Sequence, residues 1–120
     1  MTNVEIIKDF YASDNYRDLS YVDNLMDDSI SLEWNSSVGQ FTYNKADVMK
    51  LSKELFENYT DSKIEILNLF GESNSVAVHY NYFASTIENP SEMVLITKIM
   101  VIWEFKNGKI IKGHQISVLG

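Results

Sequence analysis

Helical and strand-like patterns occupy separate halves of this sequence, and this separation restricts the fold more than any other feature. Apolar residues recur at helical spacing in 2–13, 16–26 and 44–56, with an alternating strand at 30–34 and a polar loop at 35–43. From residue 63 onward only strands are expected, at 64–70, 76–85, 93–105 and 110–119. Because helices followed by strands are typical of α+β proteins, we expect three N-terminal helices in the concave face of a curved mixed or antiparallel sheet.

The predicted elements have recognisable ends. Thr2 and Glu5 have the spacing of a capping box at the start of the first helix, and Asn44 is placed to cap the third. Asn107-Gly108 between two apolar runs predicts a tight β-hairpin before the last strand. No linker or repeat interrupts the 120 residues, so we expect residues 1–120 to form one domain.

Composition excludes several classes of function. The chain has no cysteine, and a structural zinc site would have to use His79, His114 and carboxylates, so we expect neither a metal nor another cofactor. A net charge of -7 with only 10 Lys plus Arg residues argues against nucleic acids and anionic membranes as partners. The longest apolar run, 99–103, is too short to span a bilayer, and no secretory leader is recognisable, so we expect a cytoplasmic protein.

The long strands carry apolar residues on both faces. In 93–105 one face holds Thr97, Val101 and Trp103 among others, while the opposite face mixes Met100 and Ile102 with charged residues. A sheet with one wet face would alternate cleanly between apolar and polar residues. We therefore expect a homodimer formed through the outer sheet face; scattered surface apolar residues are the alternative.

Several of these features together resemble a known superfamily. The run Leu25-Met26-Asp27-Asp28-Ser29-Ile30, leading into a strand that ends near Trp34, and the closing Asn107-Gly108 hairpin resemble the nuclear transport factor 2-like superfamily. That superfamily includes SnoaL-like polyketide cyclases and ketosteroid isomerases, and the resemblance covers nearly the whole chain. It implies a cystatin-like cone with a ligand pocket at its open end and an outer sheet face often used for dimers.

The catalytic residues of that superfamily do not carry over. The three positions used by ketosteroid isomerases fall on Phe10, Trp34 and Val101, although Tyr11 adjoins the first. Epoxide hydrolases of the superfamily use an Asp-Arg-Asp set, and the only arginine, Arg17, is predicted to be exposed at the start of the second helix. The resemblance therefore implies the fold and a pocket, and does not assign a reaction.

The alternation of the strands predicts which side chains face the pocket. The parity that carries the large apolar residues turns His79, His114, Glu33 and Glu104 outward, which leaves no strand carboxylate or histidine inside. Thr97 also faces inward. The predicted ligand-binding residues are Tyr11, Trp34, Tyr80, Tyr82, Val101, Trp103, Gln115 and Ser117. The alternative for each aromatic residue is a core position whose polar atom finds a protein partner.

Three hypotheses for the function remain open. The first is a protein that binds a small, mostly apolar or aromatic molecule in the cone. The second is a small isomerase, cyclase or dehydratase with a pocket base. The candidates for that base are His79 or His114, turned inward by a β-bulge, or Asp61, with Tyr80 or Tyr82 assisting. The third is a dimerisation or adaptor module, which predicts a cone filled by its own side chains.

Overall fold

The computed structural model describes residues 1–120, and its helices lie in the first half of the chain. They are α1 (Asn3–Tyr11), the 3-10 turn η1 (Asn15–Arg17), α2 (Leu19–Leu25) and α3 (Lys45–Asn58). The Thr2 hydroxyl accepts a hydrogen bond from the Glu5 amide at 3.1 Å, and the Asn44 side chain accepts one from the Asp47 amide at 2.9 Å. Both predicted caps are therefore confirmed, and they fix where α1 and α3 begin. None of the helices has the length and apolar character of a bilayer-spanning segment.

The second helix is shorter than the continuous helix predicted for 16–26, because Asp18 interrupts it. The Asp18 carboxylate accepts hydrogen bonds from two amides of the following turn, at 3.0 and 3.3 Å, and so caps α2. Before it, Ser13 (φ 50°) and Asp14 (φ 64°) adopt left-handed conformations that turn the chain. This turn brings Arg17 against the body of the protein, where it is only 8% exposed. The prediction that Arg17 is exposed is therefore wrong.

Six strands complete the structure: β1 (Met26–Ser36), β2 (Gly39–Tyr43), β3 (Tyr59–Glu72), β4 (Ser75–Thr86), β5 (Val94–Lys106) and β6 (Lys109–Leu119). They form one sheet in the order β2-β1-β6-β5-β4-β3. All neighbours are antiparallel except β1 and β6, which run parallel. The sheet is therefore mixed, and the parallel pair joins the strand from the helical half to the end of the chain.

The sequence predicts a polar loop over 35–43, but residues 39–43 form strand β2. In the structure it pairs with β1 in a hairpin that places Phe41 opposite Trp34 and Gly39 opposite Ser36. Strand β2 is an edge of the sheet and almost all of its residues are exposed, so it lacks the apolar alternation that marks a half-buried strand.

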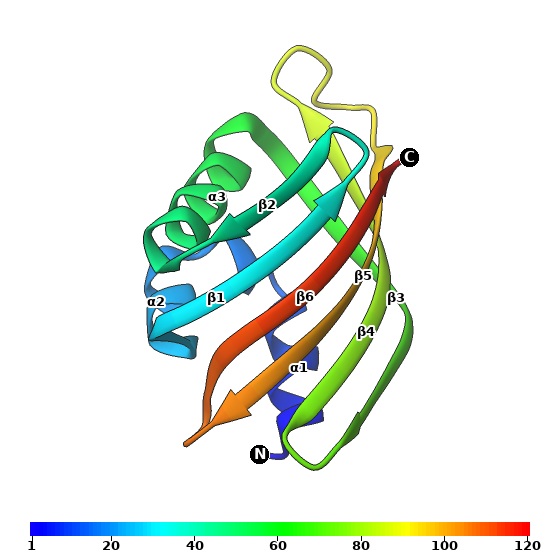
Figure 1. Cartoon of the computed structure of the whole chain (residues 1–120). Helices are drawn as coiled ribbons and strands as arrows, with labels where there is room; N and C mark the ends of the chain where they lie inside the picture. Colours follow the sequence, from blue (N-terminus) through cyan, green and yellow to red (C-terminus); the bar gives the residue numbers. More distant parts are fainter.

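The sheet curves around the helices, which lie on its concave side (Figure 1). Irregular pairing interrupts the ladders at several points. One of them lies between β5 and β6, where Glu104 pairs with Lys112 but Phe105 pairs with Ile110, so that Ile111 is an extra residue. Such bulges bend strands and change which face a side chain occupies. Ile110 is fully buried, whereas the unbroken alternation of β6 predicts that it faces outward with His114.

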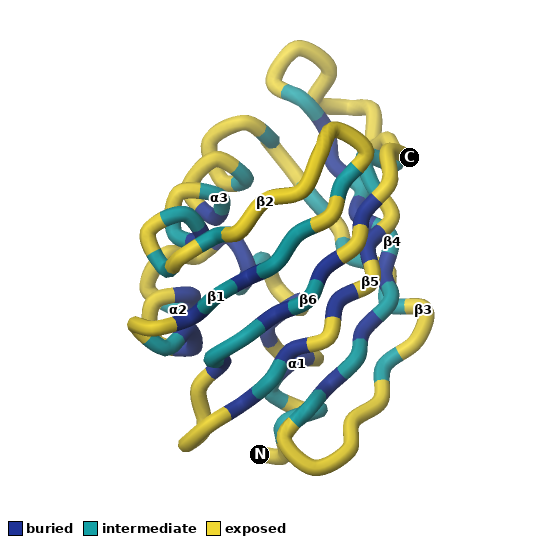
Figure 2. Tube along the Cα trace, in the orientation of Figure 1, coloured by how far each residue is buried: buried dark blue, intermediate teal, exposed yellow.

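Elsewhere the predicted alternation is confirmed. Figure 2 shows buried residues alternating with less buried ones along β4 and β5. Val101 and Trp103 are buried under the helices, while Met100 and Ile102 are exposed on the opposite face. The buried parity joins Ile7 and Val22 of the helices in a single hydrophobic cluster, so the core lies between the concave face and the helices.

Candidate functional site

A cavity of about 230 Å³ lies between the concave face of the sheet and the helices. Its wall comes from α1, η1, α2 and α3 and from every strand except β2, and 17 of its 20 lining residues are hydrophobic. The other three are Ser52, Thr97 and Gln115, and no Asp, Glu, His, Lys or Arg is among the lining residues. The cone is therefore not filled by its own side chains, which contradicts the expectation attached to the adaptor hypothesis.

Six of the eight predicted ligand-binding residues line this cavity: Tyr11, Trp34, Tyr80, Tyr82, Trp103 and Gln115. Val101 and Ser117 do not, so their prediction as pocket-lining residues is wrong. Val101 faces inward but is 2% exposed within the core cluster, covered by its neighbours. The Ser117 hydroxyl accepts a hydrogen bond at 2.8 Å from the indole Nε1 of Trp34 and so supports this lining residue from behind.

Aromatic side chains that bond to one another form one part of the wall. Trp103 Nε1 donates a hydrogen bond to the Tyr11 hydroxyl at 3.0 Å, and the rings of Tyr11 and Tyr80 lie with centroids 4.6 Å apart. Burial raises the pKa of Tyr11, and burial followed by the neighbouring Tyr11 raises that of Tyr80. Both phenols therefore stay neutral at physiological pH and act only through hydrogen bonds and their apolar rings.

Tyr82 lines another part of the cavity. The rings of Tyr16 and Tyr59 meet its ring edge-on, each with centroids 6.0 Å away. Its hydroxyl is buried without a hydrogen-bond partner in the protein. Burial also raises the pKa of Tyr82, so this phenol is neutral as well.

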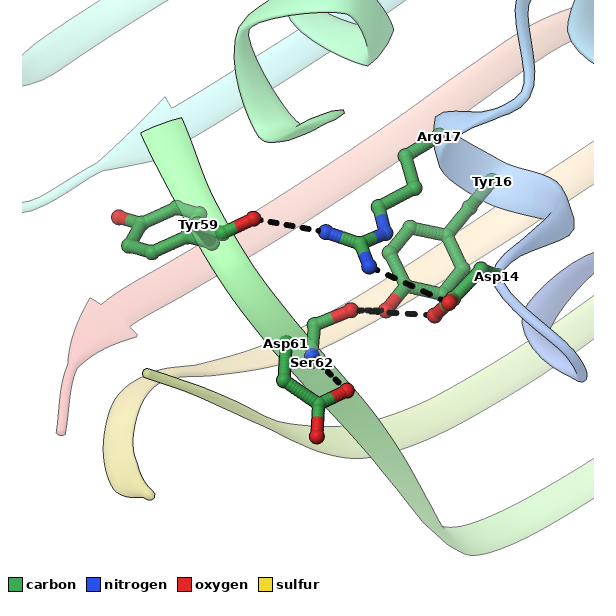
Figure 3. A network of polar contacts seen from close by, with 6 residues as sticks. All are labelled: Asp14, Tyr16, Arg17, Tyr59, Asp61 and Ser62. Atoms are coloured by element: carbon green, nitrogen blue, oxygen red, sulfur yellow. Dashed lines mark hydrogen bonds and ion pairs between the residues drawn. The ribbon is translucent and has the colours of Figure 1, made fainter. Parts of the chain in front are cut away.

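Next to Tyr82 lies a polar network that connects the cavity wall to the protein surface (Figure 3). The Tyr16 hydroxyl is hydrogen-bonded to Ser62 Oγ, which donates to Asp14 Oδ1 at 3.3 Å. Asp14 Oδ2 accepts from Arg17 Nη2 at 3.2 Å, and Arg17 Nη1 donates to the Tyr59 carbonyl at 3.0 Å. The network thus ties η1 to the start of β3 behind two cavity-lining tyrosines, Tyr16 and Tyr59.

Sequence reasoning missed this network, because its two halves are more than 40 residues apart and neither has a motif. The only local signal was the i,i+3 spacing of Asp14 and the single arginine, which is compatible with a surface ion pair. Asp61, the predicted loop carboxylate, lies on β3. It is exposed, accepts a hydrogen bond from the Ser62 amide at 2.9 Å, and does not line the cavity.

Both histidines lie on the outer face of the sheet, as the alternation predicts, and neither lines the cavity. His114 Nδ1 lies 3.1 Å from Glu33 Oε2, and its Nε2 lies 3.4 Å from Glu104 Oε2. His79 Nδ1 lies 3.1 Å from the Asn68 amide nitrogen. The irregular pairings nearest to the histidines have their extra residues at Leu67 on β3 and Ile111 on β6, so β4 and β6 keep their alternation at His79 and His114 and neither imidazole is turned inward to serve as a pocket base.

Structures of other proteins share this fold at low sequence identity. A proposed SnoaL-like polyketide cyclase from Jannaschia sp. CCS1 has a TM-score of 0.72 at 14% identity, over 96% of this chain and 84% of that one. IdmH from Streptomyces antibioticus, also a proposed polyketide cyclase, has a TM-score of 0.75 at 12% identity, over 97% and 92%. An epoxide hydrolase of M. tuberculosis, similar to limonene epoxide hydrolase, has a TM-score of 0.71 at 12% identity, over 95% and 80%.

The family is established by the sequence itself. The sequence has no significant match among curated proteins. The model of the SnoaL-like domain, however, matches residues 7–113, which include every helix and strand from α2 to β5. The cone, its mixed sheet and its helices agree with the neighbouring structures, and the protein is a member of the SnoaL-like domain family within the nuclear transport factor 2-like superfamily.

Proposed function

We propose that the protein binds a small, uncharged, mostly apolar or aromatic molecule in the cavity between the sheet and the helices. The observation that carries this proposal is a cavity of about 230 Å³ without a charged lining residue. An engineered apolar cavity of about 150 Å³ takes up benzene, and drug-sized ligands occupy roughly 300–1,000 Å³. A ligand of one or two rings therefore fits this cavity, whereas a charged ligand would lose its hydration without gaining a partner.

The chemistry of the cavity wall supports binding without catalysis over the isomerase, cyclase or dehydratase alternative. Proton transfer near neutral pH needs a group that titrates there. The wall offers only tyrosines in this role, and burial raises the pKa of Tyr11, Tyr16, Tyr80 and Tyr82 above the usual value near 10. Two structural neighbours are proposed polyketide cyclases, and aromatic ligands agree with that likeness.

Isothermal titration calorimetry with naphthalene and with 2-naphthoate tests the proposal. We expect naphthalene to bind and 2-naphthoate to bind at least tenfold more weakly, because no cation lines the cavity. Leu51→Trp places a larger side chain in the cavity and should abolish naphthalene binding. The matched control Lys50→Trp adds the same side chain at the neighbouring exposed position of α3 and should leave binding unchanged. Absence of naphthalene binding to the unmodified protein would refute the proposed function.

We also propose that two copies associate through the outer face of the sheet. Met100, Ile102, Ile116 and Val118 are exposed there on adjacent strands, next to a groove that His79 and His114 also line. Sedimentation velocity should report a dimer for the unmodified protein and a monomer for Met100→Glu. Met93→Glu, at an exposed apolar residue just before β5, should remain dimeric. A monomeric unmodified protein would contradict this part of the proposal.

The cytoplasmic location expected from the sequence belongs to the same proposal. It is compatible with a chain that has no cysteine and needs no oxidising compartment to fold. Fractionation of cells into cytoplasm, membranes and medium would check it, and recovery of the protein from the medium would contradict it.

A further inference from the structure

Most polar groups in the cavity wall already have partners within the protein. Ser52 Oγ donates to the Tyr16 carbonyl at 2.9 Å, and Thr97 Oγ1 donates to the Val118 carbonyl at 2.8 Å. The indole of Trp34 donates to the Ser117 hydroxyl behind the wall, and the indole of Trp103 donates to the Tyr11 hydroxyl within it. These groups hold the wall in shape, and their donors are not free for a ligand.

Gln115 is different from the other two polar lining residues. It is only 7% exposed and lines the cavity, yet its side-chain amide makes no hydrogen bond within the protein. The Gln115 amide is not among the fully buried atoms without a partner, so its polar atoms are open to the cavity, and a ligand that covers them must supply their hydrogen bonds or lose affinity. Its backbone lies in the interior of the sheet, paired with Val101 on β5 and with Trp34 on β1, and is therefore rigidly held.

The chemistry of the amide restricts what can pair with it. A glutamine side chain presents an acceptor oxygen and a donor NH₂ side by side, in either orientation of the amide. A ligand that satisfies both atoms must carry a donor and an acceptor on one edge. Because the surrounding wall is apolar and uncharged, the remainder of the ligand is apolar and the edge itself is neutral.

We infer that the Gln115 amide orients the ligand, and that the ligand is an uncharged aromatic molecule with an adjacent donor and acceptor on one edge, as in a carboxamide or lactam. The inference rests on the proposed function, since it names the ligand class for the same cavity. Tyr82, whose hydroxyl also lacks a protein partner, donates and accepts at one oxygen atom and so cannot by itself pair with two adjacent atoms of an edge.

Calorimetry with 2-naphthamide, 2-acetylnaphthalene and naphthalene tests this inference. The unmodified protein should bind 2-naphthamide about tenfold more tightly than naphthalene, the order expected of two neutral hydrogen bonds, with 2-acetylnaphthalene between them because it only accepts. Gln115→Met keeps the length of the side chain and removes both polar atoms. In this variant the ratio of the 2-naphthamide and naphthalene affinities should fall to between one and two.

Tyr82→Phe is the matched control, because it removes a buried hydroxyl of the wall that has no protein partner and leaves Gln115 in place. It should keep the tenfold ratio. The inference is overturned if the unmodified protein does not prefer 2-naphthamide, if Gln115→Met retains the preference, or if only Tyr82→Phe removes it. Naphthalene binding without any preference would refute the inference alone, whereas no binding of any probe would refute the proposed function as well. If Gln115→Met fails to fold, the comparison of the three probes on the unmodified protein and on Tyr82→Phe still decides the matter.

Discussion

Replacing the single arginine tests whether the network behind the cavity stabilises the fold. Arg17→Met keeps most of the unbranched stem and removes the guanidinium, which is held within the protein by two hydrogen bonds. The Tyr59 carbonyl then loses a donor at 3.0 Å, and Asp14 loses its partner at 3.2 Å. We expect the protein to fold with lower stability.

The magnitude follows from the exposure of each partner. A hydrogen bond from a charged group is worth about 1.5–3 kcal/mol, and the Tyr59 carbonyl loses this bond in the variant. Asp14 is 47% exposed, so its ion pair is screened by water and adds at most about 1 kcal/mol. Arg17 Nε is buried without a partner, which destabilises the folded protein, and the substitution removes this unfavourable contribution. A net loss of about 2 kcal/mol in the free energy of unfolding is expected.

Urea denaturation followed by circular dichroism measures this loss. With a urea m-value of about 1–3 kcal/mol/M, a loss of 2 kcal/mol lowers the midpoint by roughly 1 M while the slope stays the same. Lys53→Met is the matched control, since Lys53 is 63% exposed and forms only a surface pair with Glu57 at 3.7 Å. We expect Lys53→Met to unfold at nearly the same urea concentration as the unmodified protein. If the midpoint of Arg17→Met is equally close to that of the unmodified protein, the reasoning is refuted.

Two further predictions concern the core and the tyrosines. Gly113→Ala should lower the free energy of unfolding by about 1–3 kcal/mol, because a Cβ there would lie 2.6 Å from Trp103 Cζ3 and 2.7 Å from Leu32 Cδ1. Thermal denaturation measures this loss, and an unchanged melting temperature would show that Trp103 moves aside. Burial raises the pKa values of Tyr11, Tyr16, Tyr80 and Tyr82, and burial together with Asp9 raises the pKa of Tyr21 to about 12. Above pH ~10 the folded state therefore holds more protons than the unfolded state. Stability should therefore be complete below pH ~10 and fall above it, with phenolate absorbance at 295 nm rising together with the loss of circular dichroism; phenolate absorbance that rises while the fold persists would contradict this.

Local chemistry in the sequence was sufficient for the fold class and most of the strands. The caps at Thr2 and Asn44 and the turn at Asn107-Gly108 act within a few residues, so their patterns can be read directly. The period of two along β4 and β5 follows from the pleat of a strand, and it placed Tyr80, Tyr82 and Trp103 on the cavity side. It also placed both histidines on the outer face.

Other features depend on contacts between distant segments and were settled only by the tertiary structure. Ile110 changes face because β6 bulges at Ile111, where two successive residues of β5 pair with Lys112 and Ile110, and β2 forms because β1 offers it an edge. Val101 has the correct parity for the cavity, but its neighbours cover it. Parity determines the direction in which a side chain points and does not determine what lies in front of it.

The cavity and its polar surroundings illustrate the same division. The sequence determined that the concave face would be apolar and free of carboxylates and imidazoles, since alternation alone assigns each side chain to a face. Only the folded chain decided that Arg17 would be buried, that Asp14 and Ser62 would meet, and that the Gln115 amide would remain without a partner. Hydrogen bonds depend on atomic distances between segments remote in sequence, and no local pattern encodes those distances.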